Sequence, residues 1–75
     1  MAKHLIMDHS GHTTIEFDKS NTADLDAAVA RFNALRKSGH TAATRKIGET
    51  EYKAPVKDFK DTEDETLFIP QLIGG

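Results

Sequence analysis

Residues 3–18 have the sequence KHLIMDHSGHTTIEFD, in which two strand-like segments flank a turn. Residues 3–8 are apolar and compact enough to form a strand, and residues 13–18 alternate between apolar and polar side chains, as a half-buried strand does. Ser10-Gly11 lies between the two segments, where Gly11 can supply the positive φ that a tight hairpin requires. The sequence therefore predicts a β-hairpin at the start of the chain.

An amphipathic helix of about four turns is predicted over residues 22–38. Its apolar side chains recur at the i, i+3, i+4, i+7 and i+10 spacing of one helix face: Leu25, Ala28, Val29, Phe32 and Leu35. Three residues at its start can serve as the N-cap: Ser20, Asn21 and Thr22. Gly39 stands where a glycine in the left-handed conformation commonly ends a helix. This helix is the strongest element that the sequence predicts.

The strand signals are weaker after the helix. Residues 41–47 can form an edge strand that ends in charged side chains. Residues 51–59 alternate in polarity but contain Pro55, which cannot donate a ladder hydrogen bond, so the sequence leaves open whether this middle region holds one strand or two. Four carboxylates in residues 61–65 indicate an exposed loop, and residues 66–69 are the last predicted strand.

The predicted fold class is α+β, with the order β-β-α-β-β and a further strand if the middle region pairs twice. A hairpin alone is marginal in water, so we expect one helix packed across a mixed sheet in two layers. The expected core joins the apolar face of the helix to apolar strand residues. Its helical members are Leu25, Val29, Phe32 and Leu35, and its strand members are Leu5, Met7, Ile15, Phe17 and either Leu67 or Ile69.

Length and composition limit the function classes. A chain of 75 residues, 37% hydrophobic and 29% charged, is one folded domain. A formal net charge of −2 lacks the basic character of a nucleic-acid binder. No apolar run approaches the roughly 20 residues of a membrane span. The absence of cysteine excludes a disulfide framework and a thiol nucleophile and suits a reducing cytoplasm. We expect a cytoplasmic domain without a nucleic-acid or membrane partner.

At its two ends the chain resembles the ubiquitin-like β-grasp family. Residues 8–17, DHSGHTTIEF, are similar to the first hairpin of ubiquitin. Residues 65–67, ETL, and 72–75, LIGG, are similar to its last strand and its Gly-Gly tail. The resemblance implies a β-grasp domain over residues 1–70 and a flexible tail over residues 71–75. Because the tail lacks the arginines of ubiquitin, the resemblance points to a divergent relative, bacterial or from a phage.

The resemblance implies a protein modifier with no catalytic residue of its own. In such proteins an E1-like adenylating enzyme uses ATP to activate the terminal carboxylate. An E2-like enzyme can then transfer it to lysines of target proteins, and an isopeptidase can remove it. Gly75 would supply the carboxylate, and Gly74 would let the tail enter a narrow channel because it has no Cβ. Three residues would provide the contacts that recognise the tail: Gln71, Leu72 and Ile73. The chain itself would bind no cofactor.

Two other functions share parts of this pattern. A sulfur carrier of the thiamin and molybdopterin type has the same fold and the same Gly-Gly end, and there Gly75 would become a thiocarboxylate. A β-grasp binding or scaffold module would use neither glycine. The sequence alone leaves these alternatives open.

Four residues around the hairpin raise the hypothesis of a metal site: His4, Asp8, His9 and His12. No further ligand stands at a recognised spacing, and histidines in turns are usually solvated, so the sequence predicts no metal site. The chain also has no nucleophile–base arrangement and no glycine-rich phosphate cradle, which favours a role other than catalysis. The apolar recognition patch of ubiquitin has one tentative counterpart here, Ile47.

Overall fold

The predicted hairpin is confirmed in the computed structural model, which describes residues 2–8 and 10–70. Strands β1 (Ala2–Asp8) and β2 (Gly11–Phe17) pair antiparallel over seven residues, from Ala2 opposite Phe17 to Asp8 opposite Gly11. Gly11 has a φ of 140°, a conformation that side chains with a Cβ rarely adopt. The turn therefore depends on glycine where the sequence predicts it.

The predicted helix is also confirmed. Helix α1 (Thr22–Lys37) begins after Asn21, whose side chain accepts a hydrogen bond of 3.0 Å from the backbone N–H of Asp24. Such a cap satisfies one of the N–H groups that the first turn leaves without an intrahelical partner. At the other end Gly39 has a φ of 100° and turns the chain out of the helix. The helix ends one residue earlier than predicted.

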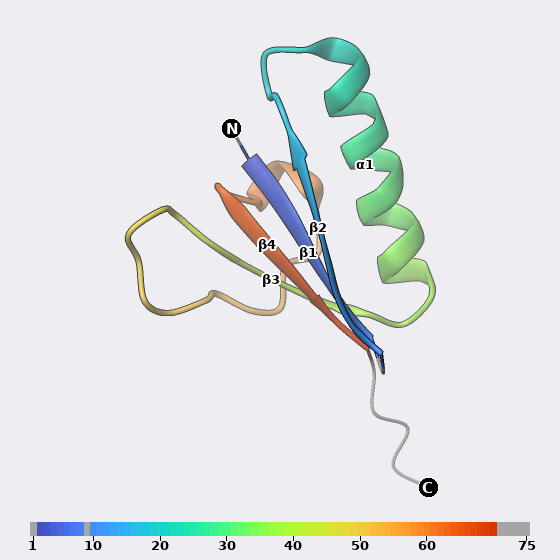
Figure 1. Cartoon of the computed structure of the whole chain (residues 1–75), viewed down its shortest axis with the longest axis vertical. Helices are drawn as coiled ribbons and strands as arrows, with labels where there is room; N and C mark the ends of the chain where they lie inside the picture. The colour runs from blue at the N-terminus through green and yellow to red at the C-terminus, as the bar shows by residue number, and fades with distance from the viewer. Residues whose placement is uncertain (1, 9, 71–75) are drawn as a thin grey trace, which may run out of the picture.

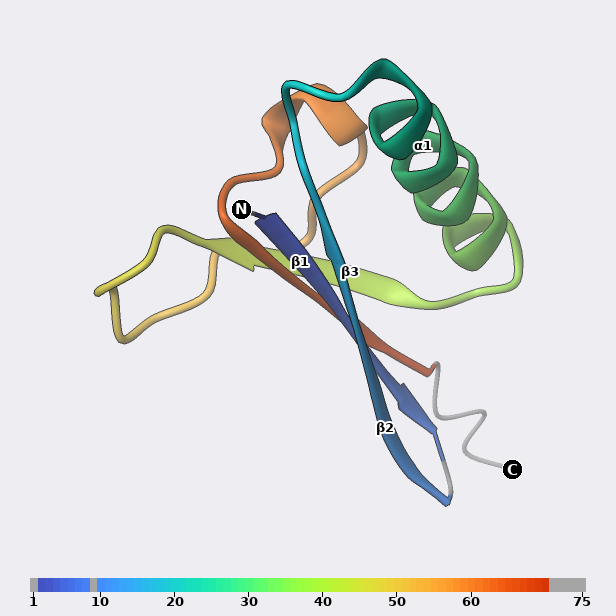
Figure 2. The same cartoon turned by 45° about the horizontal axis from the view of Figure 1, so that its top comes forward.

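Two more strands complete a mixed sheet (Figure 1). Strand β3 (Thr41–Arg45) follows the helix, and strand β4 (Glu65–Ile69) comes after a short 3-10 helix, η1 (Phe59–Asp61). The strand order is β2-β1-β4-β3, with β1 parallel to β4 and the other neighbours antiparallel. Helix α1 lies on one side of this sheet (Figure 2). The described residues thus form a β-grasp-like α+β fold.

The middle region forms one strand and not two. Within residues 51–59 only an isolated bridge forms, between Lys53 and Thr44, and the chain then leaves the sheet. Pro55 has no N–H to continue a ladder. Instead, the Val56 N–H donates to the Ala42 carbonyl at 2.8 Å, and the Val56 side chain is buried. Val56 thus packs into the core, and residues 51–59 form no second strand.

The core lies between α1 and the sheet and has two apolar clusters. Phe59 of η1 packs against both clusters and so joins them. The buried residues of the first are Phe32, Ala42, Val56 and Phe68, and those of the second are Ala2, Phe17 and Ala28. The helix thus contributes mainly one aromatic ring and one small residue, and the strands and the segment between β3 and β4 contribute the rest.

The prediction of which β1 and β4 side chains face the helix was wrong. Successive side chains of a strand point to opposite faces, and in β4 Phe68 is fully buried on the covered side. Met7 and Ile69 are 38% and 43% exposed on the other side. β1 has three consecutive apolar residues, Leu5, Ile6 and Met7. Either face of the strand could therefore be the buried one, and periodicity could not decide which. In the structure the covered side of β1 carries His4, which is polar but fully buried, and Ile6, which packs against the core.

Candidate functional site

The face of the sheet opposite α1 carries a strip of apolar side chains. Leu5 lies opposite Leu67, and Leu67 lies opposite Ala43, so these three form a row across β1, β4 and β3. Met7 and Ile69 extend this row toward the end of the sheet at which β4 finishes. We call these five residues the open-face strip. Two of them are exposed large hydrophobic side chains, a common feature of surfaces that contact a partner.

A row of charges borders the open-face strip. Lys3, Glu65 and Arg45 lie opposite one another on β1, β4 and β3. The Arg45 Nε donates to Glu65 Oε2 at 2.9 Å and its Nη2 lies 2.9 Å from the same oxygen, while Lys3 Nζ lies 3.6 Å from Oε1. Tyr52 donates its hydroxyl to Glu65 Oε2 at 3.3 Å, and the Arg45 guanidinium lies 4.6 Å from the centre of the Tyr52 ring.

The electrostatics of this row indicate a structural role. The hydrogen bond from Arg45, followed by the nearby positive charges, holds the pKa of Glu65 below its usual value. Burial raises the pKa of Tyr52. A carboxylate kept ionised, with partners on both oxygens, is poorly suited to take up a proton from a substrate. For Glu65 the prediction of a solvated loop over residues 61–65 was therefore wrong, because this residue begins β4 and its side chain is only 12% exposed.

A second polar pair lies inside the core, where sequence reasoning did not place it. His4 is 0% exposed, and its Nδ1 accepts a hydrogen bond of 2.9 Å from Arg31 Nε on α1. Its ring contacts Phe17 and Phe68 edge-on, with centroids 4.8 and 5.0 Å apart. Burial, followed by the charge of Arg31, lowers the pKa of His4 to about 4. His4 is therefore neutral at pH 7.

Within the described residues two nitrogens of this pair have no hydrogen-bond partner, His4 Nε2 and Arg31 Nη2. Because His4 Nδ1 accepts, its Nε2 carries the proton, and an unpaired buried N–H is costly. The sequence offered one signal of this pair, a histidine within the apolar segment of residues 3–8. It gave no signal of the arginine.

The four residues of the metal hypothesis do not converge where the structure describes them. His4 points into the core under α1, whereas His12 lies opposite Met7 and faces the uncovered side. Across residues 2–8 and 10–70 no group of three or more histidine, cysteine, aspartate or glutamate side chains could hold a metal ion. His9 lies outside the described residues.

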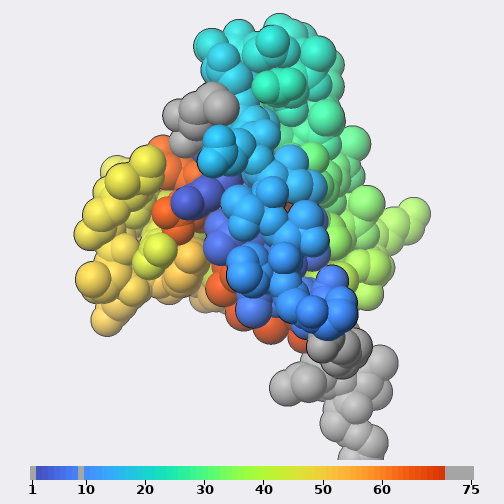
Figure 3. Space-filling view, in the orientation of Figure 1, coloured from blue at the N-terminus to red at the C-terminus, as the bar shows by residue number. Residues whose placement is uncertain are grey.

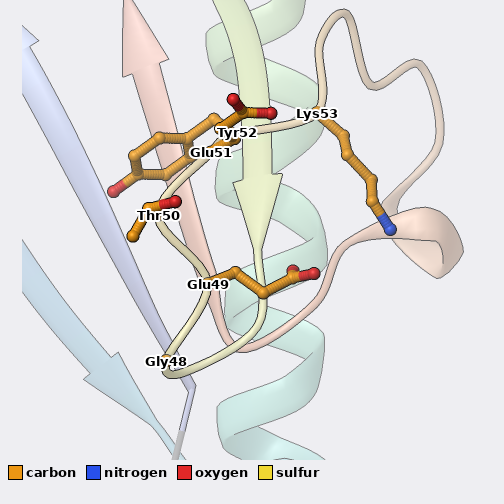
Figure 4. A pocket seen from close by; sticks show the side chains of 6 residues that line it. All are labelled: Gly48, Glu49, Thr50, Glu51, Tyr52 and Lys53. Atoms are coloured by element: carbon orange, nitrogen blue, oxygen red, sulfur yellow. The ribbon is translucent and has the colours of Figure 1, made fainter.

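The loop after β3 encloses a shallow pocket lined by residues 48–53 (Figure 4). Tyr52 and Lys53 point in opposite directions from this loop (Figure 4). Glu49 closes the loop on itself, because its carboxylate accepts from the Lys46 N–H at 2.8 Å and its carbonyl accepts from Arg45 Nη1 at 3.3 Å. Nearby Ile47 is 70% exposed and lies in this loop and not in the sheet. The pocket gathers no set of reactive groups.

The predicted conjugation residues lie outside the described residues: Gln71, Leu72, Ile73, Gly74 and Gly75. The structure does describe what leads to them. β4 is a central strand that ends at Ile69, beside the open-face strip, and Pro70 follows half-buried. Thus the chain reaches its Gly-Gly sequence from the end of a central strand.

No family model, no curated protein and no solved structure matches this chain. Among the described residues no helix is long and apolar enough to cross a membrane. The likeness to a β-grasp fold therefore rests on the strand order and the helix alone.

Proposed function

We propose that this chain is a ubiquitin-like protein modifier that is activated at the carboxylate of Gly75. One observation carries the proposal: a β-grasp-like sheet whose central strand β4, parallel to β1, is followed after Ile69 by PQLIGG. The proposal requires a free carboxylate on Gly75 in the mature protein, whether encoded as the last residue or exposed by cleavage.

The chemistry follows from the low reactivity of a carboxylate. An oxygen of the Gly75 carboxylate attacks the α-phosphorus of ATP on an E1-like enzyme, and pyrophosphate leaves. A thiolate of the enzyme then attacks the acyl carbon, and AMP leaves. Finally a lysine amine of the target displaces the thiolate and forms an amide. The two glycines leave the acyl carbon open to each attack because neither has a Cβ.

Recognition of the domain is expected at the open-face strip together with Gln71, Leu72 and Ile73. Two side chains of the strip, Met7 and Ile69, are 38% and 43% exposed, and Ile69 ends β4, so an enzyme that holds the tail can also cover them. Burying exposed apolar surface stabilises a complex by about 25 cal/mol for each Å². All groups that carry out the chemistry then belong to the partner enzymes.

The test is an ATP–pyrophosphate exchange assay with adenylating enzymes from the host of this protein. We expect exchange with the full chain, and loss of exchange when Gly74 and Gly75 are deleted. The double substitution Lys46→Ala and Lys57→Ala, at exposed positions away from Ile69 at the end of β4, is the matched control and should retain exchange. Exchange that persists without the two glycines contradicts the proposal. Circular dichroism of each variant establishes that the domain is folded.

A further inference from the structure

The two edges of the sheet differ in how they are covered. Along the outer edge of β3, Thr44 and Lys53 exchange backbone hydrogen bonds of 2.9 and 2.7 Å, and the Val56 N–H donates to Ala42 at 2.8 Å. β2 is the other edge, and among the described residues no segment pairs with its outer side. Its outward N–H and C=O groups are therefore available to another strand.

β2 also lacks the features by which edge strands usually avoid pairing. Its sequence, GHTTIEF, contains neither lysine nor proline, and Glu16 is its only acidic or basic residue besides His12. Five of its seven residues are exposed and only Phe17 is buried. In the space-filling view the blue hairpin lies at the surface with no other coloured segment over it (Figure 3).

We infer that β2 is the interface of a symmetric homodimer, in which the β2 strands of two copies pair antiparallel around Thr14. A two-fold axis perpendicular to the sheet places the α1 helices of both copies on the same side. In the register centred on Thr14, residue 11 lies opposite residue 17 and every residue of β2 has a partner. Registers centred one residue away leave residues of β2 unpaired.

The side chains of this register complement one another. His12 lies opposite Glu16 of the second copy, and by symmetry this pair of imidazole and carboxylate occurs twice. On the helix side Thr13 lies opposite Ile15, a pair of β-branched residues of the kind that stabilises strand pairing. Thr14 lies opposite itself on the uncovered side. The two four-stranded sheets thereby become one sheet of eight strands.

The expected dimer is weak. A contact along one strand edge belongs to the small interfaces, below about 1,200 Å², that form transient complexes. The fraction of chains in the dimer should therefore rise with protein concentration. The interface uses β2 and leaves the end of β4 uncovered, so it does not depend on activation of Gly75.

A cysteine introduced at the two-fold axis tests the register, because the native chain has no cysteine. In the dimer the two Cα atoms of residue 14 lie about 4.5–5.5 Å apart, a distance that a disulfide spans. Thr14→Cys should therefore form a covalent dimer on mild oxidation. Ala27→Cys, exposed on α1, is the matched control and should cross-link at least about tenfold more slowly. Equal rates for the two variants overturn the inference.

Charge substitutions at Thr14 provide a second, independent test by sedimentation equilibrium. The wild-type mass should rise from 8.3 kDa toward twice that value with concentration. Thr14→Lys and Thr14→Glu each place like charges directly opposite and should weaken association about tenfold or more. An equimolar mixture of the two variants should associate again through opposite charges. If the wild-type chain stays monomeric at millimolar concentration, the inference that β2 pairs with a second copy is contradicted. A mixture of the two variants that fails to associate contradicts it as well.

Discussion

The two faces of the sheet divide polar and apolar groups in an unexpected way. The covered face buries His4 and Thr66 beside Phe68, whereas the uncovered face carries the open-face strip and the charged row of Lys3, Glu65 and Arg45. Side-chain hydrophobicity alone therefore does not determine which face the helix covers. Aromatic packing around His4 and its hydrogen bond to Arg31 distinguish the covered face. The uncovered face keeps two large apolar side chains exposed, Met7 and Ile69.

Truncation of one apolar side chain on each face should give the largest contrast. Phe68→Ala removes a fully buried ring from the core and should lower the free energy of unfolding by about 3–5 kcal/mol. Ile69→Ala, its neighbour on the uncovered face, should cost about 1 kcal/mol or less. Urea denaturation measures both values. If Phe68→Ala leaves too little folded protein, Phe68→Leu should show an intermediate loss. Equal losses on the two faces would contradict the facing described here.

Acid should destabilise the protein through the covered face. The pKa of His4 is about 4 in the folded state against a usual 6.5, so the unfolded chain takes up its proton at higher pH. The stabilisation is thus fully present above pH 6.5 and is lost as pH falls to 4. A shift of this size corresponds to about 3 kcal/mol. His4→Leu should flatten the dependence of the unfolding free energy on pH between 6.5 and 4.

The control for this prediction is His12→Leu, at an exposed position of β2. The loss of stability in acid should persist in this variant, because the buried His4 is still present. If His4→Leu shows the same slope as the wild type, the account of the buried histidine is wrong.

The charged row of Lys3, Glu65 and Arg45 should contribute least to the free energy of unfolding. Glu65→Gln removes the charge that pairs with Arg45 and Lys3 and should cost about 1 kcal/mol at pH 7, because both cations are partly exposed. The pKa of Glu65 is lowered in the folded state, so its stabilisation is present above the usual value of 4.5 and is lost as pH falls through the folded pKa. The difference from wild type should therefore shrink in acid. Glu16→Gln, at an exposed position of β2, is the comparison and should cost less.

The sequence predicted local elements better than their tertiary arrangement. The hairpin turn at Gly11 and the helix end at Gly39 each depend on neighbouring residues, and both are confirmed, while the N-cap is Asn21, one of the three residues that the sequence left open. The facing of β1 depended on where α1 docks, which three apolar residues in a row do not reveal. Whether the middle region holds one strand or two could not be decided from the sequence, because Val56 is buried in the core through a long-range contact that an alternating pattern cannot encode.

The candidate sites also differ in whether the sequence alone could predict them. The Gly-Gly sequence and its flanking residues were found by resemblance, and they lie outside the described residues. The open-face strip and the His4–Arg31 pair emerge only when elements distant in sequence become neighbours. Neither could be assembled from spacing along the chain.

The most direct measurement of the proposed function is the tryptic mass spectrum of proteins from the native host. No lysine or arginine follows Lys60, so trypsin would leave residues 61–75, DTEDETLFIPQLIGG, attached to any modified lysine. We expect lysine peptides of other proteins that carry this branch through an amide to Gly75. A branch-free peptide ending in the Gly75 thiocarboxylate, about 16 mass units heavier because sulfur replaces oxygen, would contradict the modifier and identify a sulfur carrier. Residues 61–75 found only as the unmodified peptide would contradict both.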